Sequence, residues 1–183
     1  MKLAADDIKR VTLELGGKSA NLIFADADLE TAVPKSMWSV LGNAGQDCCA
    51  RSRILVDRAI YPVFLEQLIA QFQTLKLGKP SDEATEIGCL ISKQHRDRVH
   101  EYVEIGKSEG AKLVCGGDFP TGEPFETGAY LEPTIFANVD AKMRIAQEEI
   151  FGPVVCVIPF SSEEEAVAIA NDSLYGLSGS IWT

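Results

Sequence analysis

The chain has 183 residues, of which 46% are hydrophobic and 24% charged, a composition that suits one globular domain with a sizeable core. The formal net charge of −10 argues against nucleic acid or an anionic membrane surface as a partner. No apolar run is long enough to cross a bilayer, and the N-terminal MKLAADDIKR lacks the apolar stretch of a signal peptide. These features predict a cytoplasmic protein without a membrane partner.

The first half of the chain predicts strands that alternate with helices. In VTLEL (11–15), Val11, Leu13 and Leu15 share one face, which predicts a strand ended by the two glycines that follow. The further elements expected here are a helix over 29–41 with Asp26 or Asp28 as its cap, a strand at 53–56 and a helix over 61–75.

The second half repeats this alternation. The expected elements are a helix within 92–110, a strand at 111–115, an extended segment at 130–136, a buried strand at 154–160, a helix over 163–172 capped by Ser161 or Ser162, and a strand in 178–183. Alternating strands and helices predict an α/β layered fold, with a largely parallel sheet flanked by helices.

Five cysteines are present, an odd count without the regular spacing of a secreted disulfide framework. With two histidines and no Cys-x-x-Cys pair, the usual ligand sets of structural zinc are missing, so we expect no metal site. Three of the cysteines lie beside apolar residues and are expected to pack as small hydrophobic side chains: Cys89, Cys115 and Cys156.

The adjacent pair Cys48 and Cys49 differs, because its neighbours are polar. The guanidinium groups of Arg51 and Arg53 would favour the nucleophilic thiolate, while Asp47 would oppose it. From the residues alone, the pair indicates a reactive thiol only modestly.

Glu14 is a second candidate for chemistry. A carboxylate at a strand end acts as a general base if burial raises its pKa, and the alternative interpretation is an ordinary solvated glutamate. His95 and His100 lie five residues apart in a charged helix and share no helical face. A cysteine–histidine hydrolase therefore stays open, without local support in the sequence.

Three segments strongly resemble signature motifs of the NAD(P)-dependent aldehyde dehydrogenase superfamily, and a fourth, the last named below, resembles a further segment of the family. They are ELGGKSAN (14–21), NAGQDCCARSR (43–53), EEIFGPV (148–154) and NDSLYGLSGSIWT (171–183). Their order is that of the family, and nearly the whole chain can be laid along the family's catalytic domain. The resemblance implies an aldehyde dehydrogenase catalytic-domain fold over residues 1–183.

The resemblance also implies residue roles. It places the nucleophile on Cys48, with its backbone N–H as an oxyanion donor, and the general base on Glu14. It places contacts to the nicotinamide ribose hydroxyls on Glu149 and the aromatic beside the nicotinamide on Phe151. Asn43 and Gln46 match motif positions that scaffold the cysteine loop.

The implied reaction is oxidation of a small-molecule aldehyde to a carboxylic acid with NAD or NADP, through a thiohemiacetal and a thioester on the cysteine. Two alternatives are an acylating enzyme that passes the thioester to coenzyme A and a non-catalytic interaction module of the same fold. Glu14 favours hydrolysis, since acylating members generally lack this glutamate. The intact Cys48 speaks against the non-catalytic module.

Only thirteen residues precede Glu14, whereas the family's cofactor-binding domain precedes this motif. The resemblance therefore implies a catalytic-domain fragment that lacks both that domain and the family's last strand. We expect the missing domain to make most cofactor contacts, and the isolated fragment to be inactive as a dehydrogenase. Apolar surface left uncovered would favour self-association, so a homo-oligomer is expected.

Overall fold

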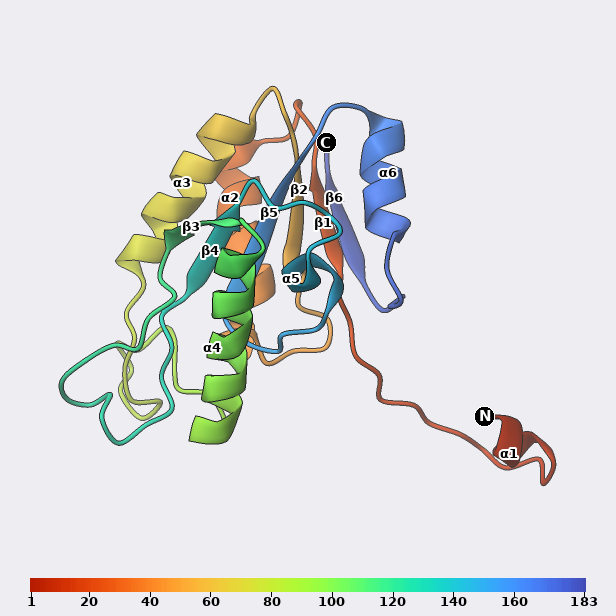
Figure 1. The fold of residues 1–183 in the computed structure, drawn as a ribbon, viewed down its shortest axis with the longest axis horizontal. Coiled ribbons are helices and arrows are strands. Elements are labelled where there is room, and N and C mark those ends of the chain that lie inside the picture. The colour runs from red at the N-terminus through yellow and green to blue at the C-terminus, as the bar shows by residue number, and fades with distance from the viewer.

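The computed structural model describes all of residues 1–183, which form one six-stranded sheet with helices on both faces (Figure 1). The strands are β1 (Ala20–Ile23), β2 (Arg53–Asp57), β3 (Lys112–Cys115), β4 (Thr134–Ala137), β5 (Val154–Phe160) and β6 (Gly179–Trp182). They are ordered β3-β4-β5-β2-β1-β6, and every neighbouring pair is parallel except β3–β4. The predicted layered α/β fold with a largely parallel sheet is confirmed.

The helices are α1 (Lys2–Ala5), α2 (Leu29–Leu41), α3 (Tyr61–Thr74), α4 (Lys93–Ser108), α5 (Arg144–Gln147) and α6 (Glu163–Asn171), with a 3₁₀ turn at Gly42–Gly45. None of them has the length and apolarity needed to cross a membrane. The short helices α1 and α5 and the 3₁₀ turn are absent from the sequence prediction.

Strand register shows which helices share a face of the sheet. Ala20, Arg53 and Cys156 are paired across β1, β2 and β5, so their side chains point to the same face. On that face the Cys156 thiol donates to the carbonyl oxygen of Ile145 in α5 at 3.2 Å. The neighbouring residue Asn21 points to the other face, where its Nδ2 donates to Ser36 Oγ in α2 at 2.8 Å.

The central strands are buried on both faces. β1 and β4 are buried throughout their length, and β5 is buried except at Pro159. A parallel sheet covered on both sides needs continuous apolar runs rather than alternation, which is the pattern of VVCVIPF. The sheet therefore forms the core, and its loops carry the polar residues.

Two candidate N-cap residues are predicted for each of the helices α2 and α6, and in both cases the residue directly before the helix is the N-cap. Asp28 rather than Asp26 caps α2, since its carboxylate accepts from the Glu30 N–H at 3.1 Å. At α6, Ser162 Oγ accepts from the Glu165 N–H at 3.2 Å, while the Glu165 carboxylate accepts from the Ser161 N–H at 2.7 Å. Both serines thus belong to one reciprocal cap.

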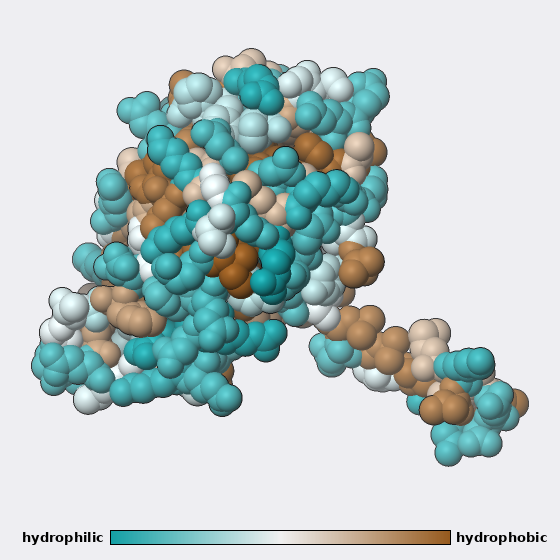
Figure 2. All heavy atoms as spheres, viewed as in Figure 1, coloured by the Kyte–Doolittle hydropathy of each residue, from teal (hydrophilic) through white to brown (hydrophobic).

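The strand predicted at 11–15 is wrong. These residues have no regular secondary structure, and they lie in a segment that extends from the body of the molecule toward α1 (Figure 1). Val11, Leu13 and Leu15 are exposed, and Figure 2 shows this segment as a row of apolar residues away from the core. A segment with alternating apolar residues forms a strand only where another segment hydrogen-bonds to its backbone N–H and C=O groups. No other part of the chain does this for residues 11–15.

A buried arginine joins the sheet to α6. Arg53 Nε donates to the Lys18 carbonyl at 2.8 Å, and its Nη1 and Nη2 donate to the carbonyls of Ile169 and Ala170 at 2.9 Å each. The last two carbonyls lie in the final turn of α6, where a cation offsets the negative end of the helix dipole. The guanidinium is therefore fully engaged with backbone oxygens.

Candidate active site

Residues 43–53, the cysteine loop, begin where α2 ends and hold their shape through reciprocal hydrogen bonds. Asn43 Nδ2 donates to the Gln46 carbonyl and Gln46 Nε2 donates to the Asn43 carbonyl, both at 3.0 Å. Gln46 Oε1 also accepts from the Ile91 N–H at 2.9 Å. These bonds hold a tight turn in which Asn43, Ala44 and Gly45 have φ values of 52°, 56° and 75°. Such left-handed conformations persist in non-glycine residues when the surroundings fix them.

Cys48 and Cys49 are both half-buried, with their sulfur atoms 4.0 Å apart. The hydrogen bond with Cys49 and partial desolvation raise the pKa of the Cys48 thiol, and the negative charges of Asp47 and Glu14 raise it further. The expectation that neighbouring arginines favour the thiolate is therefore wrong in this structure. One reason is that Arg53 points into the sheet and binds carbonyl oxygens.

Glu14 lies near Cys48 but is exposed. Its carboxylate is among the charges that raise the pKa of the Cys48 thiol, so its electrostatic influence reaches the sulfur. The burial that the sequence analysis required of a general base is absent, because the segment around Glu14 extends from the body of the protein. Proximity, rather than burial, is what the structure provides.

Gly17 and Gly45 allow three segments to approach closely: the first contains Gly16 and Gly17, the second is the cysteine loop, and the third contains Glu149 and Gly152. Gly17 packs so closely on the cysteine loop that a Cβ at this position would overlap the carbonyl oxygen of Cys48. Gly45 packs in the same way on the carbonyl oxygen of Gly152. A side chain at either position would separate the segments, so glycine is required by close approach.

Glu149 links the third segment to the first. Its Oε1 accepts from the Gly17 N–H at 2.9 Å, and a Cβ on Gly16 would meet its Oε2 at 2.5 Å. The carboxylate is half-buried at this junction. It therefore has a structural partner that the sequence did not indicate.

Phe151 stands in an uncommon backbone conformation, with φ of 61° and a ring that is 38% exposed. Its carbonyl oxygen accepts from His95 Nε2 at 2.7 Å, and the two rings meet edge to face with centroids 6.2 Å apart. His95 is thus held to the loop that carries Phe151, a role that sequence reasoning missed. No local motif signals it, since the two residues are 56 positions apart.

Lys18 is the one buried cation beside this junction whose amine lacks a partner. Its Nζ makes no hydrogen bond, and burial lowers its pKa from about 10.5 to about 8. Nearby charges of Cys156, Glu149 and Glu148 act in the opposite direction, and Arg53 adds to the lowering. No sequence motif singles out Lys18, whose burial is evident only in the folded chain.

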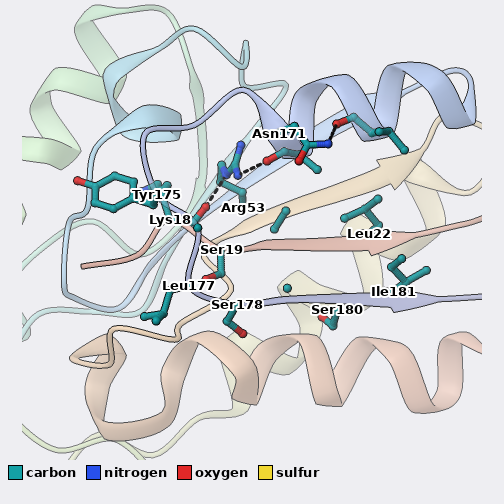
Figure 3. A pocket seen from close by; sticks show the side chains of 15 residues that line it. Lys18, Ser19, Leu22, Arg53, Asn171, Tyr175, Leu177, Ser178, Ser180 and Ile181 are labelled. Atoms are coloured by element: carbon teal, nitrogen blue, oxygen red, sulfur yellow. Dashed lines mark hydrogen bonds between the residues drawn. The ribbon is translucent and has the colours of Figure 1, made fainter. Parts of the chain in front are cut away.

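Two hollows differ in what they can hold. A space of about 10 Å³ lies where the three segments meet, bordered among others by Gly17, Gly45, Glu149 and Phe151, and holds at most one water molecule. A cavity of about 640 Å³ lies between α6 and the two adjacent strands β1 and β6, at one side of the sheet (Figure 3). Neither Cys48 nor Glu14 borders the larger cavity, so the structure shows no roomy substrate cleft at the thiol.

Comparison with known proteins matches the whole chain to one family. The model of the aldehyde dehydrogenase family covers residues 1–183. Betaine aldehyde dehydrogenase of Bacillus subtilis is 49% identical over all 183 residues, which span 37% of that protein. The chain thus covers little more than a third of the curated relatives it matches.

Solved structures agree with this match. Betaine aldehyde dehydrogenase from Staphylococcus aureus in complex with NAD⁺ superposes with a TM-score of 0.94 at 44% identity, covering all of this chain and 36% of that one. An aldehyde dehydrogenase of Mycobacterium tuberculosis complexed with NAD⁺ gives a TM-score of 0.93 at 50% identity, with 100% and 37% coverage. Fold and sequence therefore point to the same family.

Gly17→Ala tests the close approach of the first two segments. The added Cβ overlaps the Cys48 carbonyl, so we expect a loss of about 1–3 kcal/mol in unfolding free energy, measured by urea denaturation. Gly42→Ala is the matched control, because nothing lies within 4 Å of its Cβ position. Equal stability of the two variants would show that the segments do not meet as described.

Asp47→Asn tests the charge that acts on the thiol. Asparagine keeps an oxygen for the Cys49 N–H, which Asp47 Oδ1 accepts at 2.9 Å, but removes a negative charge that raises the pKa of Cys48. The pKa should fall, so more thiolate exists at a given pH and alkylation by iodoacetamide should be faster below the titration midpoint. Peptide mass mapping in metal-free buffer follows the rate against pH, with Cys89 as internal control. A profile that moves to higher pH, or not at all, would contradict this electrostatic account.

Proposed function

The chain belongs to the aldehyde dehydrogenase family, and on that premise we propose that residues 1–183 are the catalytic domain of an enzyme that oxidises an aldehyde to a carboxylic acid with NAD(P)⁺. The observation that carries the proposal is the close packing of Gly17 on Cys48, with Glu149 bonded to the same glycine. This packing supports a shared site for the thiol and the Glu149 carboxylate, and the charge of Glu14 that acts on the same thiol supports adding a second carboxylate.

Cys48 is the proposed nucleophile. As the thiolate, its sulfur adds to the aldehyde carbonyl carbon and forms a tetrahedral thiohemiacetal. The negative charge then moves to the former carbonyl oxygen, which needs hydrogen-bond donors, and the backbone N–H of Cys48 is one such donor. Asn43 and Gln46 contribute indirectly, since their hydrogen bonds hold the turn that precedes the thiol.

Two residues fit a nicotinamide cofactor. Phe151 offers an exposed aromatic ring on a loop fixed by His95, and the Glu149 carboxylate offers oxygens that can accept from ribose hydroxyls. When bound, NAD(P)⁺ supplies the hydride acceptor that converts the thiohemiacetal to a thioester. The NAD⁺ complexes of the relatives from S. aureus and M. tuberculosis support NAD⁺ as the cofactor.

Glu14 is the proposed general base for release of the product. It takes a proton from water, the hydroxyl adds to the thioester carbonyl, and the Cys48 thiolate leaves as the carboxylic acid forms. Its charge reaches Cys48, which supports a position within the same reaction space. Hydrolysis is therefore favoured over transfer to coenzyme A.

The remainder of the enzyme is proposed to complete the site. The chain spans 37% of its B. subtilis relative, and the hollow at the junction of about 10 Å³ holds neither an aldehyde nor a cofactor. We propose that regions outside residues 1–183 form the substrate cleft and most cofactor contacts, and that the 183 residues alone do not reduce NAD⁺. Five free cysteines fit work in the reducing cytoplasm. Exposed apolar residues such as Leu174 and Ile181 fit a homo-oligomer.

Ester hydrolysis tests the role of the nucleophile separately from that of the cofactor, because it needs no hydride acceptor. We expect the 183-residue chain to release p-nitrophenol from p-nitrophenyl acetate without forming NADH from an aldehyde. Cys48→Ser should lower this release by roughly a hundredfold or more, as removal of a nucleophile does elsewhere. Cys49→Ser, one position away and equally half-buried, should keep most of it.

Absorbance of p-nitrophenolate measures both the initial burst and the turnover. Unchanged release from Cys48→Ser, or loss of release only in Cys49→Ser, would overturn the assignment of the nucleophile. Rapid NADH formation by the isolated chain would overturn the proposal that other regions complete the site.

A further inference from the structure

The cysteine loop brings three ligand atoms together that no sequence pattern indicates. One oxygen of Asp47 and the sulfur atoms of Cys48 and Cys49 all lie within 4.8 Å of one another. Asp47 is exposed and both cysteines are half-buried, so the group is accessible from solvent. We propose that these three residues form a binding site for a thiophilic divalent cation, with Zn²⁺ as the representative ion, and that an occupied site blocks the nucleophile. The consequence for the nucleophile rests on the proposed function, whereas metal binding does not.

The sulfur separation fits a tetrahedral zinc dithiolate. With Zn–S bonds near 2.3 Å and tetrahedral angles, two thiolate ligands lie about 3.8 Å apart. Cys48 Sγ and Cys49 Sγ are 4.0 Å apart without any metal, so small side-chain adjustments complete the pair. From the sequence no metal site is expected, since the chain has two histidines and no Cys-x-x-Cys pair.

The carboxylate is already oriented toward the thiols. Asp47 Oδ1 accepts from the Cys49 N–H at 2.9 Å, which holds the side chain over the dipeptide. Carboxylate oxygens bind zinc at about 2.0–2.2 Å, so Asp47 would supply the third ligand. Water would take the fourth position, on the exposed side of the loop.

The surrounding charge favours a cation. Apart from the Cys49 thiol, the side chains whose charge acts on Cys48 are those of Asp47 and Glu14, both acidic. Neither of the two arginines that the sequence suggested for this loop is among the groups that act on Cys48, and the guanidinium of Arg53 binds three backbone carbonyls instead. A divalent cation would offset this negative charge. Binding releases two thiol protons to solvent as two metal–sulfur bonds form, and no electrons are transferred.

Zinc titration of the 183-residue chain against a chromophoric chelator tests the site directly. We expect one Zn²⁺ per chain, with affinity lowered at least about tenfold in Cys49→Ser and by a smaller factor in Asp47→Asn. Cys89→Ser is the matched control, since Cys89 is also half-buried but lies outside the cluster. Circular dichroism checks that each variant folds. Equal affinity of Cys49→Ser and the unchanged chain, or loss of affinity only in Cys89→Ser, would overturn the proposal.

Protection of the thiol gives a second readout that needs no variant. Zn²⁺ should slow alkylation of Cys48 by iodoacetamide, and EDTA should restore the original rate, as located by peptide mass mapping. Alkylation of Cys48 at the same rate with and without Zn²⁺ would also overturn the site. The zinc site and the proposed reaction can fail separately. If the chain binds Zn²⁺ but Cys48→Ser hydrolyses the ester as fast as the unchanged chain, the proposed reaction is wrong and the zinc site stands.

Discussion

The contact on which the site depends is between two backbones: Gly17 packs against the carbonyl of Cys48 with no room for a side chain. The same glycine donates its N–H to Glu149, so one residue joins all three segments of the site. The backbone at Gly17 thus explains why segments separated by more than 130 positions lie together.

Electrostatics around this junction oppose a free thiolate. The hydrogen bond with Cys49, partial burial and two acidic neighbours raise the pKa of the Cys48 thiol, while the guanidinium of Arg53 donates to carbonyls at the end of α6. The buried Lys18 lies on the sheet side, and its pKa of about 8 reflects the cost of keeping an unpartnered ammonium inside the protein. The groups that act on this thiol therefore do not favour the thiolate, and its activation is left to a base or to the rest of the enzyme.

The regular elements could be predicted because local patterns carry them. Apolar stripes predicted α2 and α3, and an unbroken apolar run predicted β5, since burial imposes those patterns directly. Residues 11–15 alternate like a strand yet have no pairing partner, and partners are not a local property. In the site, the motifs indicated Cys48, Glu14 and Glu149, but not the His95–Phe151 contact or the buried Lys18. Those depend on which loops meet, which only the folded chain shows.

The central claim is that Cys48 and Glu14 serve successive steps in one space. Mass spectrometry of the chain after brief exposure to p-nitrophenyl acetate tests it most directly, by locating the acetyl group and following its lifetime. The account predicts acetylation of Cys48, with an acetyl group that persists roughly a hundredfold longer in Glu14→Gln, since a general base contributes about 10²–10⁴-fold to such a step. Acetyl on another residue, or equal lifetimes in both proteins, would contradict it.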